Sequence, residues 1–267
     1  MQTSLADRAA TLLGVRVSGA AALSGGDLSA VHRLRLADGG SAIAKQGHLV
    51  SEEAVMLEAI AASGAPAPAV LALADDLLLI EEMPNDAHVA GSWDHLAETL
   101  NTLHASIGHG YGWPSDYAFG RVAIPNGATQ GWPTFWAERR LRCHLPHLPA
   151  ALARRLERLA DRLPDLLPEH PAPALLHGDL WGGNVLVSGD RVTALIDPAS
   201  YHGHREVDAA MLTLFDAPTP RFFDALALET GWQARQPIYR LWPLLVHLRL
   251  FGSSYAGAVE AALTEVE

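Results

Sequence analysis

Apolar residues in the first 84 positions recur at the short spacing that is typical of β-strands. Residues 22–46 contain three strand-like segments, separated by a Gly-Gly pair and an Asp-Gly-Gly run. Residues 51–64 then show helical spacing, and residues 64–84 hold two further apolar strands. A short amphipathic helix over residues 4–14 precedes the first strand. The pattern therefore predicts a small, mostly antiparallel sheet with one inserted helix.

The pattern changes to helical spacing beyond residue 84. Residues 92–107 place apolar side chains three and four positions apart. Residues 108–134 are instead rich in glycine, proline and aromatic residues, which indicates a functional segment or one capped by short helices. The other segments that read as helices are 134–146, 148–163 and 207–263. We therefore predict an α+β fold with a sheet-rich domain at 1–84, a larger helical domain at 85–267, and a cleft between them.

The composition narrows the function classes. The 267 residues include 30 acidic and 19 basic ones, which gives a formal net charge of −11. Such a balance argues against general nucleic-acid binding. The single cysteine, Cys143, excludes an intrachain disulfide and fits a reducing compartment. Neither a secretory leader nor an uncharged apolar run of about 18 residues is visible, so we expect a soluble cytoplasmic protein without membrane or nucleic-acid partners.

The run HGDLWGGN, residues 177–184, is the most informative stretch of the chain. Asp179 lies on it five positions before Asn184, which opens a short apolar strand, and Asp197 ends the next such strand. If these strands form a hairpin, Asn184 and Asp197 meet at its open end. Their oxygens suit Mg²⁺ on nucleotide phosphates, and Asp179 is left to accept a proton from a hydroxyl. The simpler alternative is a polar turn whose side chains cap the backbone.

The spacing of Asp179 and Asn184 equals that of the kinase catalytic loop. Phosphoryl transfer also requires a phosphate-binding cation, which kinases place earlier in the chain. A lysine on a strand should reach the phosphates while a helix carboxylate holds it. Lys45 ends a predicted strand, and Glu53 shares the helical register of the apolar Met56, where an unpaired charge is costly. The alternatives are a solvated strand end for Lys45 and a first-turn acid that the helix dipole favours for Glu53.

Two further segments are candidates for nucleotide binding. Gly25 and Gly26 lie in a turn whose backbone N–H groups can approach phosphates, although a Gly-Gly pair alone is weak evidence. Glu82 and Met83 follow the last predicted strand, where the connector between the two domains can meet an adenine. The domain at 1–84 would then bind the nucleotide, and that at 85–267 would carry the catalytic loop and the acceptor.

Together, HGDLWGGN, the following "IDPASYHGHREVDAAM" and the late "YRLWPLLVHLRLFGSSY" closely resemble the fructosamine kinase (ketosamine-3-kinase) family. That family belongs to the aminoglycoside phosphotransferase and choline kinase branch of the protein-kinase-like superfamily. The resemblance covers nearly the whole chain and implies a bilobal kinase-like fold that uses ATP and Mg²⁺ to phosphorylate ketosamines, free or on a glycated protein. It implies Asp179 as base, Asn184 and Asp197 as metal ligands, and Lys45, oriented by Glu53, on the phosphates. It also implies Trp181 and Tyr201 as walls of the sugar site, and we expect a monomer.

Two other functions remain open. The first is a kinase whose acceptor is another alcohol, such as an aminoglycoside, choline or a different sugar. The second is a nucleotide-binding pseudokinase, which the presence of Asp179, Asp197 and Lys45 disfavours. The chain also departs from the family pattern at residues 202–204, "HGH", which bears on the substrate more than on catalysis.

Several polar residues near the motifs have structural roles as their simplest interpretation. His202 and His204 read as solvated loop residues close to the site, and His177 as a support for the backbone of the catalytic loop. Glu206 and Asp208 are candidates to brace that loop, with an acidic helix start as the alternative. Cys143, with the neighbouring histidines of "RCHLPH", lacks the second ligand pair that a metal site needs.

Overall fold

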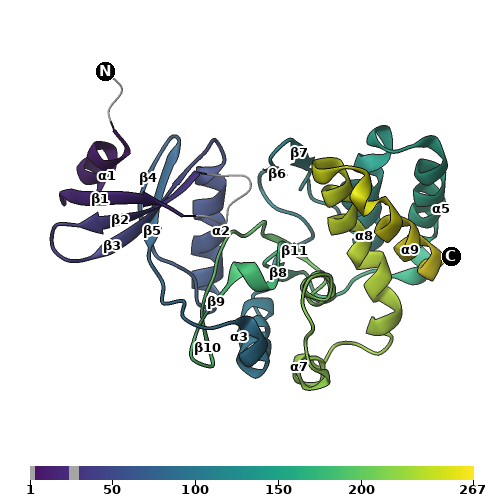
Figure 1. Cartoon of the computed structure of the whole chain (residues 1–267). Helices are drawn as coiled ribbons and strands as arrows, with labels where there is room; N and C mark the ends of the chain where they lie inside the picture. The colour runs from purple at the N-terminus through teal and green to yellow at the C-terminus, as the bar shows by residue number, and fades with distance from the viewer. Residues whose placement is uncertain (1–3, 24–29) are drawn as a thin grey trace.

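The structure is a computed structural model that describes residues 4–23 and 30–267. Its N-terminal part is a five-stranded antiparallel sheet in the order β1-β2-β3-β5-β4, with helices α1 and α2 against it (Figure 1). The sheet and helix predicted for this region are thus present. The bounds are α1 (Leu5–Leu13), β1 (Val17–Ala22), β2 (Ala30–Leu36), β3 (Ser41–Gln46), α2 (Val50–Ala62), β4 (Val70–Ala74) and β5 (Leu77–Glu81).

The sheet is apolar on both faces because a helix covers each of them. Leu77 and Leu79 of β5 pack with Ala9 of α1. The alternate residues Leu78 and Ile80 pack with α2. Side chains alternate between faces along a strand, so a continuous apolar run such as that of β5 is the signature of a strand buried on both sides. Lys45 of β3 pairs with Leu78 and therefore lies on the α2 side of the sheet.

The C-terminal part is mostly helical and contains three two-stranded antiparallel sheets. Two of them are hairpins, β6 (Tyr117–Phe119) with β7 (Val122–Ile124) and β9 (Val185–Ser188) with β10 (Arg191–Leu195), and the third pairs β8 (Ala174–Leu176) with the distant β11 (Tyr201–Gly203). The helices are α3 (Trp93–His104), α4 (Trp132–Phe135), α5 (Ala150–Leu166), α6 (Glu206–Leu212), α7 (Pro220–Leu226), α8 (Trp232–Phe251) and α9 (Ala256–Val266). A π-helical turn (Trp136–Leu141) and short 3₁₀ turns (Val89–Gly91, Arg142–His147, Gly182–Asn184 and Ser253–Tyr255) complete it.

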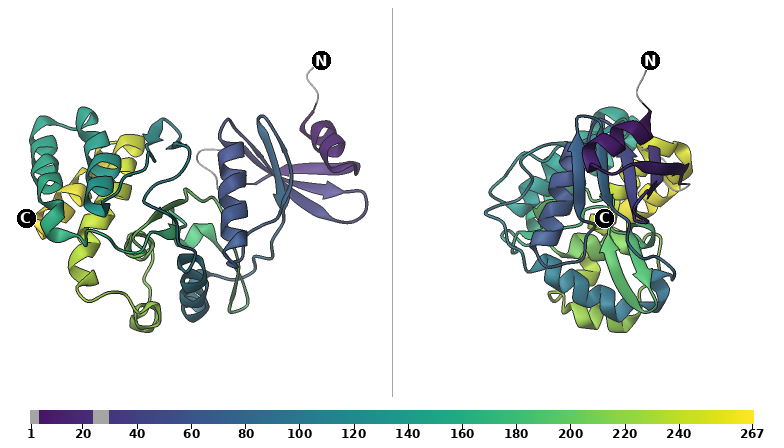
Figure 2. Two further views of the ribbon diagram at one scale, coloured as in Figure 1. Left: turned by 180° about the vertical axis from the view of Figure 1, so that it is seen from behind. Right: turned by 90° about the vertical axis from the view of Figure 1, so that its left-hand side faces the viewer.

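Helix α2 joins the two parts. It stands between the sheet and the helical part in both long views (Figures 1 and 2). Its Ile60 belongs to the core that also holds Leu100 of α3 and Val187 of β9. The connector after β5 is tied to the same place, because the backbone N–H of Asp86 donates to the carbonyl of Val187 at 2.9 Å. The arrangement is an α+β fold in two parts, while the domain boundary at residue 84 stays a prediction.

The segment 108–134, which lacks periodicity in sequence, contains the β6–β7 hairpin, and the short helix α4 begins at its end. Hydrogen bonds from two arginines hold the hairpin at both ends. The guanidinium of Arg140, which is fully buried, donates to the backbone carbonyl of Pro125 at 2.7 Å and to the side-chain oxygen of Asn126 at 2.8 Å. At the turn, Arg121 donates to the carbonyl of Leu250 at the end of α8, at 2.9 Å.

No helix in the described part of the chain is long and apolar enough to span a membrane.

Candidate active site

Lys45, Glu53 and Asp197 form one charged cluster. The Lys45 ammonium bonds the carboxylate of Glu53 and lies 2.5 Å from Oδ1 of Asp197. Both Lys45 and Glu53 are only 5% exposed, so neither charge is tolerable without the other. Burial opposes the charge on Lys45, but Glu53 and Asp197 outweigh it and raise the pKa of the lysine. Strand β3 and the first turn of α2 thus bring together the pair predicted from sequence.

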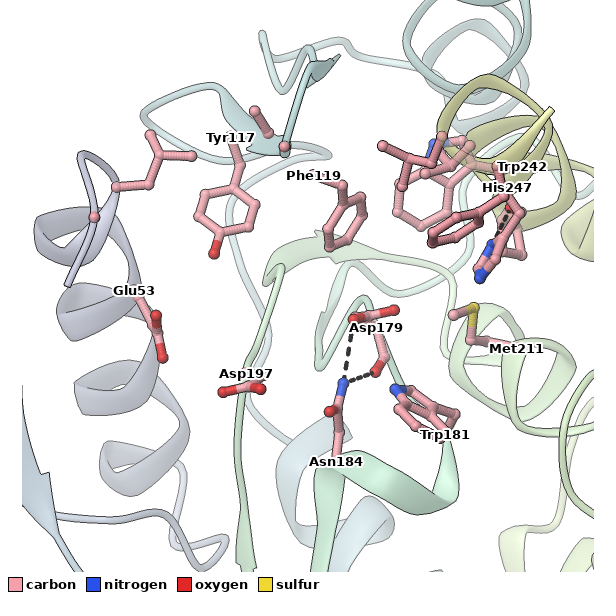
Figure 3. A pocket seen from close by; sticks show the side chains of 18 of the residues that line it. Glu53, Tyr117, Phe119, Asp179, Trp181, Asn184, Asp197, Met211, Trp242 and His247 are labelled. Atoms are coloured by element: carbon pink, nitrogen blue, oxygen red, sulfur yellow. Dashed lines mark hydrogen bonds between the residues drawn. The ribbon is translucent and has the colours of Figure 1, made fainter. Parts of the chain in front are cut away.

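The β9–β10 hairpin positions the two candidate metal ligands. Asn184 directly precedes β9 and Asp197 follows β10, and the Ile196 backbone N–H donates to the Asn184 carbonyl at 3.0 Å. Asp197 adopts a φ of 53°, which is strained for a residue with a side chain. The two side chains lie near each other at the open end of the hairpin, as predicted (Figure 3).

The loop of residues 177–184 holds Asp179 over this hairpin. Asn184 Nδ2 donates to the Asp179 carbonyl at 2.8 Å and to its Oδ2 at 3.1 Å. Burial, and then the charges of Asp197 and Asp208, raise the pKa of the Asp179 carboxyl to about 7, although the Asn184 hydrogen bond opposes the shift. Gly178 has a φ of 81°, and a Cβ there would lie 2.1 Å from the carbonyl of Ala199. Only glycine therefore fits at this point of the loop.

Asp208 of α6 braces the loop from below. Its carboxylate accepts the backbone N–H groups of His177 and Gly178 at 2.9 and 3.0 Å, and His104 Nε2 lies 3.0 Å away. His177 supports the loop in turn, because its Nε2 lies 2.9 Å from the carbonyl of Ile196. The predicted bracing role holds for Asp208. Glu206 does not share it, because its carboxylate is paired with Arg235.

The two predicted walls of the sugar site lie in different surroundings. Trp181 is 40% exposed and lines the same cavity as Asp179. Tyr201 is 0% exposed and is stacked on Phe135, with the guanidinium of Arg140 over its ring at 4.1 Å. The expectation for Tyr201 is therefore wrong, because the pairing of β11 with β8 places its ring inside the core of the helical part.

One cavity of about 530 Å³ contains the whole set. Glu53 and Asp197 line one end, Asp179 and Asn184 the middle, and an aromatic group around Trp181 the other end (Figure 3). Lys45 lies at the first end, because its ammonium is bound to Glu53 and Asp197. Tyr117 and Phe119 of the β6–β7 hairpin form its roof, and sequence reasoning missed both. Burial, and then Glu53 and Asp197, raise the pKa of the Tyr117 phenol, so it remains a hydrogen-bond donor. The aromatic content of 108–134 was the only signal for them.

The candidate nucleotide contacts are the predicted turn at Gly25 and Gly26 and the connector residues Glu82 and Met83. Gly25 and Gly26 lie outside the described residues. Glu82 and Met83 follow β5 directly, as expected of a connector, but neither lines the cavity. The Glu82 carboxylate is paired with Arg33 of β2. Contact between this segment and an adenine stays a prediction.

The two histidines of residues 202–204 are not solvated loop residues. His204 is buried, and its Nδ1 lies 2.8 Å from the hydroxyl of Tyr239. His202 lies on β11, half-buried, and is stacked on Trp113 at 5.7 Å between ring centroids. His202 is held by the short pairing of β11 with β8, which single-sequence periodicity does not reveal, and His204 follows that strand directly.

The side-chain oxygens of Asn184 and Asp197 suit a hard divalent cation that also binds phosphate. The Asn184 amide nitrogen is used by Asp179, so its Oδ1 is available to the cavity. The Asp197 side chain is partly exposed to the same space. No cluster of three His, Cys, Asp or Glu side chains suited to a metal occurs within residues 4–23 and 30–267. Two protein oxygens plus phosphate oxygens are what Mg²⁺ commonly takes.

Comparison with known proteins places this geometry in a family. A family model described as fructosamine kinase matches residues 15–266. The chain belongs to the fructosamine kinase family. It is 34% identical to a "probable ketoamine kinase" of Synechocystis sp. over 83% of this chain and 80% of that one. As a member of this family, it is a phosphotransferase with an alcohol group as acceptor.

Solved structures agree with this assignment. A crystal structure from Thermobifida fusca with a provisional fructosamine-3-kinase assignment is 31% identical, covers 98% of both chains and has a TM-score of 0.91. An aminoglycoside phosphotransferase, solved with ADP and hygromycin B, covers 98% of this chain and 99% of its own at 18% identity, with a TM-score of 0.72. The second likeness shows that the fructosamine kinase family shares its kinase-like fold with that enzyme.

Proposed function

We propose that this chain transfers the γ-phosphoryl group of ATP, in the presence of Mg²⁺, to a sugar hydroxyl of a ketosamine. The observation that carries the proposal is the single cavity in which Lys45, Asn184, Asp197 and Asp179 converge beside Trp181. The charged end suits phosphates, and the aromatic end suits a sugar, whose C–H faces pack on aromatic rings. Relatives described as probable ketoamine kinases support the choice of acceptor.

Lys45 is the phosphate-binding cation of this proposal. Glu53 fixes its ammonium, so the lysine loses little freedom when the phosphates arrive. Its bond to Asp197 is exchanged in part for phosphate oxygens on nucleotide binding. The turn at Gly25 and Gly26 would cover the phosphates, and the backbone at Glu82 and Met83 would meet the adenine.

Asn184 and Asp197 would hold Mg²⁺ through side-chain oxygens. When bound, the ion neutralises charge on the β- and γ-phosphates, which is a large part of catalysis in phosphoryl transfer. The protein's own contribution is to keep both oxygens turned toward the cavity. The hairpin register and the Asn184–Asp179 hydrogen bonds do this.

Asp179 is the base of the proposed reaction. Its carboxylate accepts the proton of the sugar hydroxyl, the hydroxyl oxygen bonds to the γ-phosphorus, and the bond between that phosphorus and the bridging oxygen breaks to release ADP. The proton on Asp179 then passes to solvent. A carboxyl pKa of about 7 is close to working pH, which suits both acceptance and release.

An ADP-release assay with fructosyl and ribulosyl amines tests this proposal. We expect ATP- and Mg²⁺-dependent turnover and a sugar phosphate visible by phosphorus NMR. Asp197→Asn should raise the Mg²⁺ concentration required, whereas Asp190→Asn, an exposed acid at the tip of the same hairpin, should not. ATP binding without turnover of any ketosamine would refute the proposal and favour a pseudokinase. Turnover of aminoglycosides or choline alone would move the acceptor to another alcohol.

A further inference from the structure

We propose that the aromatic end of the cavity is a subsite for the amine substituent of the acceptor, and that it selects apolar or aromatic substituents without a carboxylate. The inference rests on the proposed function, because it concerns the part of a ketosamine that extends beyond the sugar. The aromatic end comprises Phe119, Trp181, Phe215, His247, Phe251 and Tyr255.

Exposed aromatic side chains are concentrated at this one place. Among the large exposed apolar residues of the described chain, three are aromatic: Trp181 at 40%, Phe215 at 43% and Phe251 at 49%. All three line the cavity, whereas exposed aliphatic residues such as Leu71 and Ile107 do not. Apolar side chains that converge from distant segments and remain exposed indicate a surface that binds a ligand.

The rings make a continuous wall. Trp181 contacts Phe215 edge-on at 6.2 Å between centroids, and Phe215 lies 5.2 Å from His247. His247 in turn lies 5.5 Å from Phe251 and 4.9 Å from Tyr255. A sugar on Trp181 would therefore direct its substituent along this wall, away from Asp179.

His247 supplies one polar group within the wall. Its Nδ1 lies 2.7 Å from the Pro243 carbonyl, which can only accept, so Nδ1 carries the proton in the assigned tautomer. The other nitrogen, Nε2, is then an acceptor, and Figure 3 shows the ring at the cavity wall. An ammonium N–H is a suitable donor to it. The basic amine of a ketosamine carries such a group.

The aromatic end of the cavity discriminates against anionic substituents, because no free cation lies there in the described part of the chain. Lys45 is the only lysine or arginine among the described residues that line it, and Glu53 and Asp197 already bind its ammonium. Arg121, close to the aromatic end, is bound to backbone carbonyls, among them that of Leu250. A carboxylate on the substituent would lose water without gaining a cationic partner. A protonated amine beside aromatic faces gains cation–π attraction instead.

The aromatic wall, the acceptor nitrogen of His247 and the lack of a free cation among the described lining residues together define a substrate class. Sugars on simple aliphatic or aromatic amines fit, as do sugars on a lysine side chain whose own carboxylate is distant or in a peptide bond. A sugar on the α-amino group of a free amino acid does not fit, because its carboxylate would lie next to the amine among the rings.

A matched pair of acceptors tests whether the subsite excludes a carboxylate next to the amine. The amide and the free acid of fructosyl-phenylalanine differ only in the carboxylate, and the same pair is made with ribulose. We expect kcat/KM to be at least about tenfold higher for the amide. Equal values for acid and amide, or a preference for the acid, would overturn this inference while leaving the proposed function intact. No turnover of any ketosamine would overturn both.

A second pair tests the aromatic wall. We expect fructosyl-benzylamine to exceed fructosyl-methylamine in kcat/KM, and Phe215→Ala and Phe251→Ala to reduce that ratio by about fivefold or more. The ratio is measured on one enzyme preparation, so a partly misfolded variant cannot mimic the effect. Leu71→Ala, an exposed apolar side chain on β4, should leave the ratio unchanged. A ratio that Phe215→Ala and Phe251→Ala both leave unchanged would contradict the subsite.

His247→Phe separates the polar contact from the aromatic one. It keeps a ring but removes the acceptor, so KM should rise by about tenfold for benzyl and methyl derivatives alike. The benzyl-to-methyl ratio should stay near that of the unaltered enzyme. An unchanged KM would remove His247 from the subsite.

Discussion

The carboxylate of Asp208 accepts a hydrogen bond from the backbone N–H of His177 at 2.9 Å. A second bond from Gly178 at 3.0 Å and the nearby His104 complete its surroundings. Burial opposes the charge on Asp208, but His104, His177 and these N–H groups outweigh it and lower the pKa of the carboxyl. The loop of residues 177–184 is therefore held by a buried anion on α6, which fixes the backbone just before Asp179.

Asp208→Asn should weaken both the fold and the reaction. The amide cannot accept two N–H bonds as a charged carboxylate does, and it leaves His104 without its partner. We expect the free energy of unfolding to fall by about 2–4 kcal/mol, measured by urea denaturation. We expect kcat to fall more than the ATP KM rises. Asp190→Asn, on an exposed turn, serves as the control, and equal stability of the two variants would contradict the bracing role.

Glu53→Gln should impair phosphoryl transfer and lower the stability of the fold, with Asp197 left as the carboxylate partner of Lys45. The neutral amide no longer fixes the Lys45 ammonium, which leaves the lysine drawn to Asp197 alone. We expect kcat/KM for ATP to fall by about 10–100-fold. Glu58→Gln, on the exposed face of the same helix, should behave as the unaltered enzyme. Full activity of Glu53→Gln would show that the ion pair is only structural.

The pH profile should report the raised pKa of Asp179. A carboxyl with a pKa near 7 is largely protonated below that pH and cannot then accept a proton. Activity should therefore rise with pH through about 7 and be lost below it, when kcat/KM for the acceptor is followed across the range. A profile whose acidic limb lies near the ordinary aspartate value of about 4 would show that Asp179 is not raised in the working enzyme.

Trp181 and Tyr201 should differ in their effect on the acceptor. Trp181 lines the cavity, so Trp181→Ala should raise the acceptor KM by about tenfold or more. Tyr201 is enclosed in the core, so Tyr201→Phe should leave that KM within about twofold. Initial-rate kinetics on both variants with one ketosamine decide the matter. A large KM effect from Tyr201→Phe would restore it to the sugar site.

The sequence was sufficient where local spacing decides the geometry. The register of Glu53 with Met56 indicated a buried carboxylate, and the hairpin placed Asn184 beside Asp197. Both relationships depend on helix or hairpin periodicity, which a single sequence displays. The sheet of residues 15–83 was predictable for the same reason.

The roof and the aromatic end were not predictable, because long-range packing positions them. Tyr117 lies on a three-residue strand fastened through Arg140, and Phe215, His247 and Tyr255 meet only when α6 packs on α8. The resemblance to the family implied Tyr201 as a wall of the sugar site, yet the pairing of β11 with β8 buries its ring in the core. A short strand pairing between distant segments decides where this ring lies, and a single sequence does not display that pairing.

The central claim is that Asp179 removes the proton from a ketosamine hydroxyl, and Asp179→Asn tests it most directly. Product formation from ATP and the best ketosamine of the panel is measured by phosphorus NMR, and ATP affinity is measured on the same preparation. We predict turnover at least about a hundredfold below that of the unaltered enzyme, with ATP binding retained. Full turnover by Asp179→Asn would contradict the account.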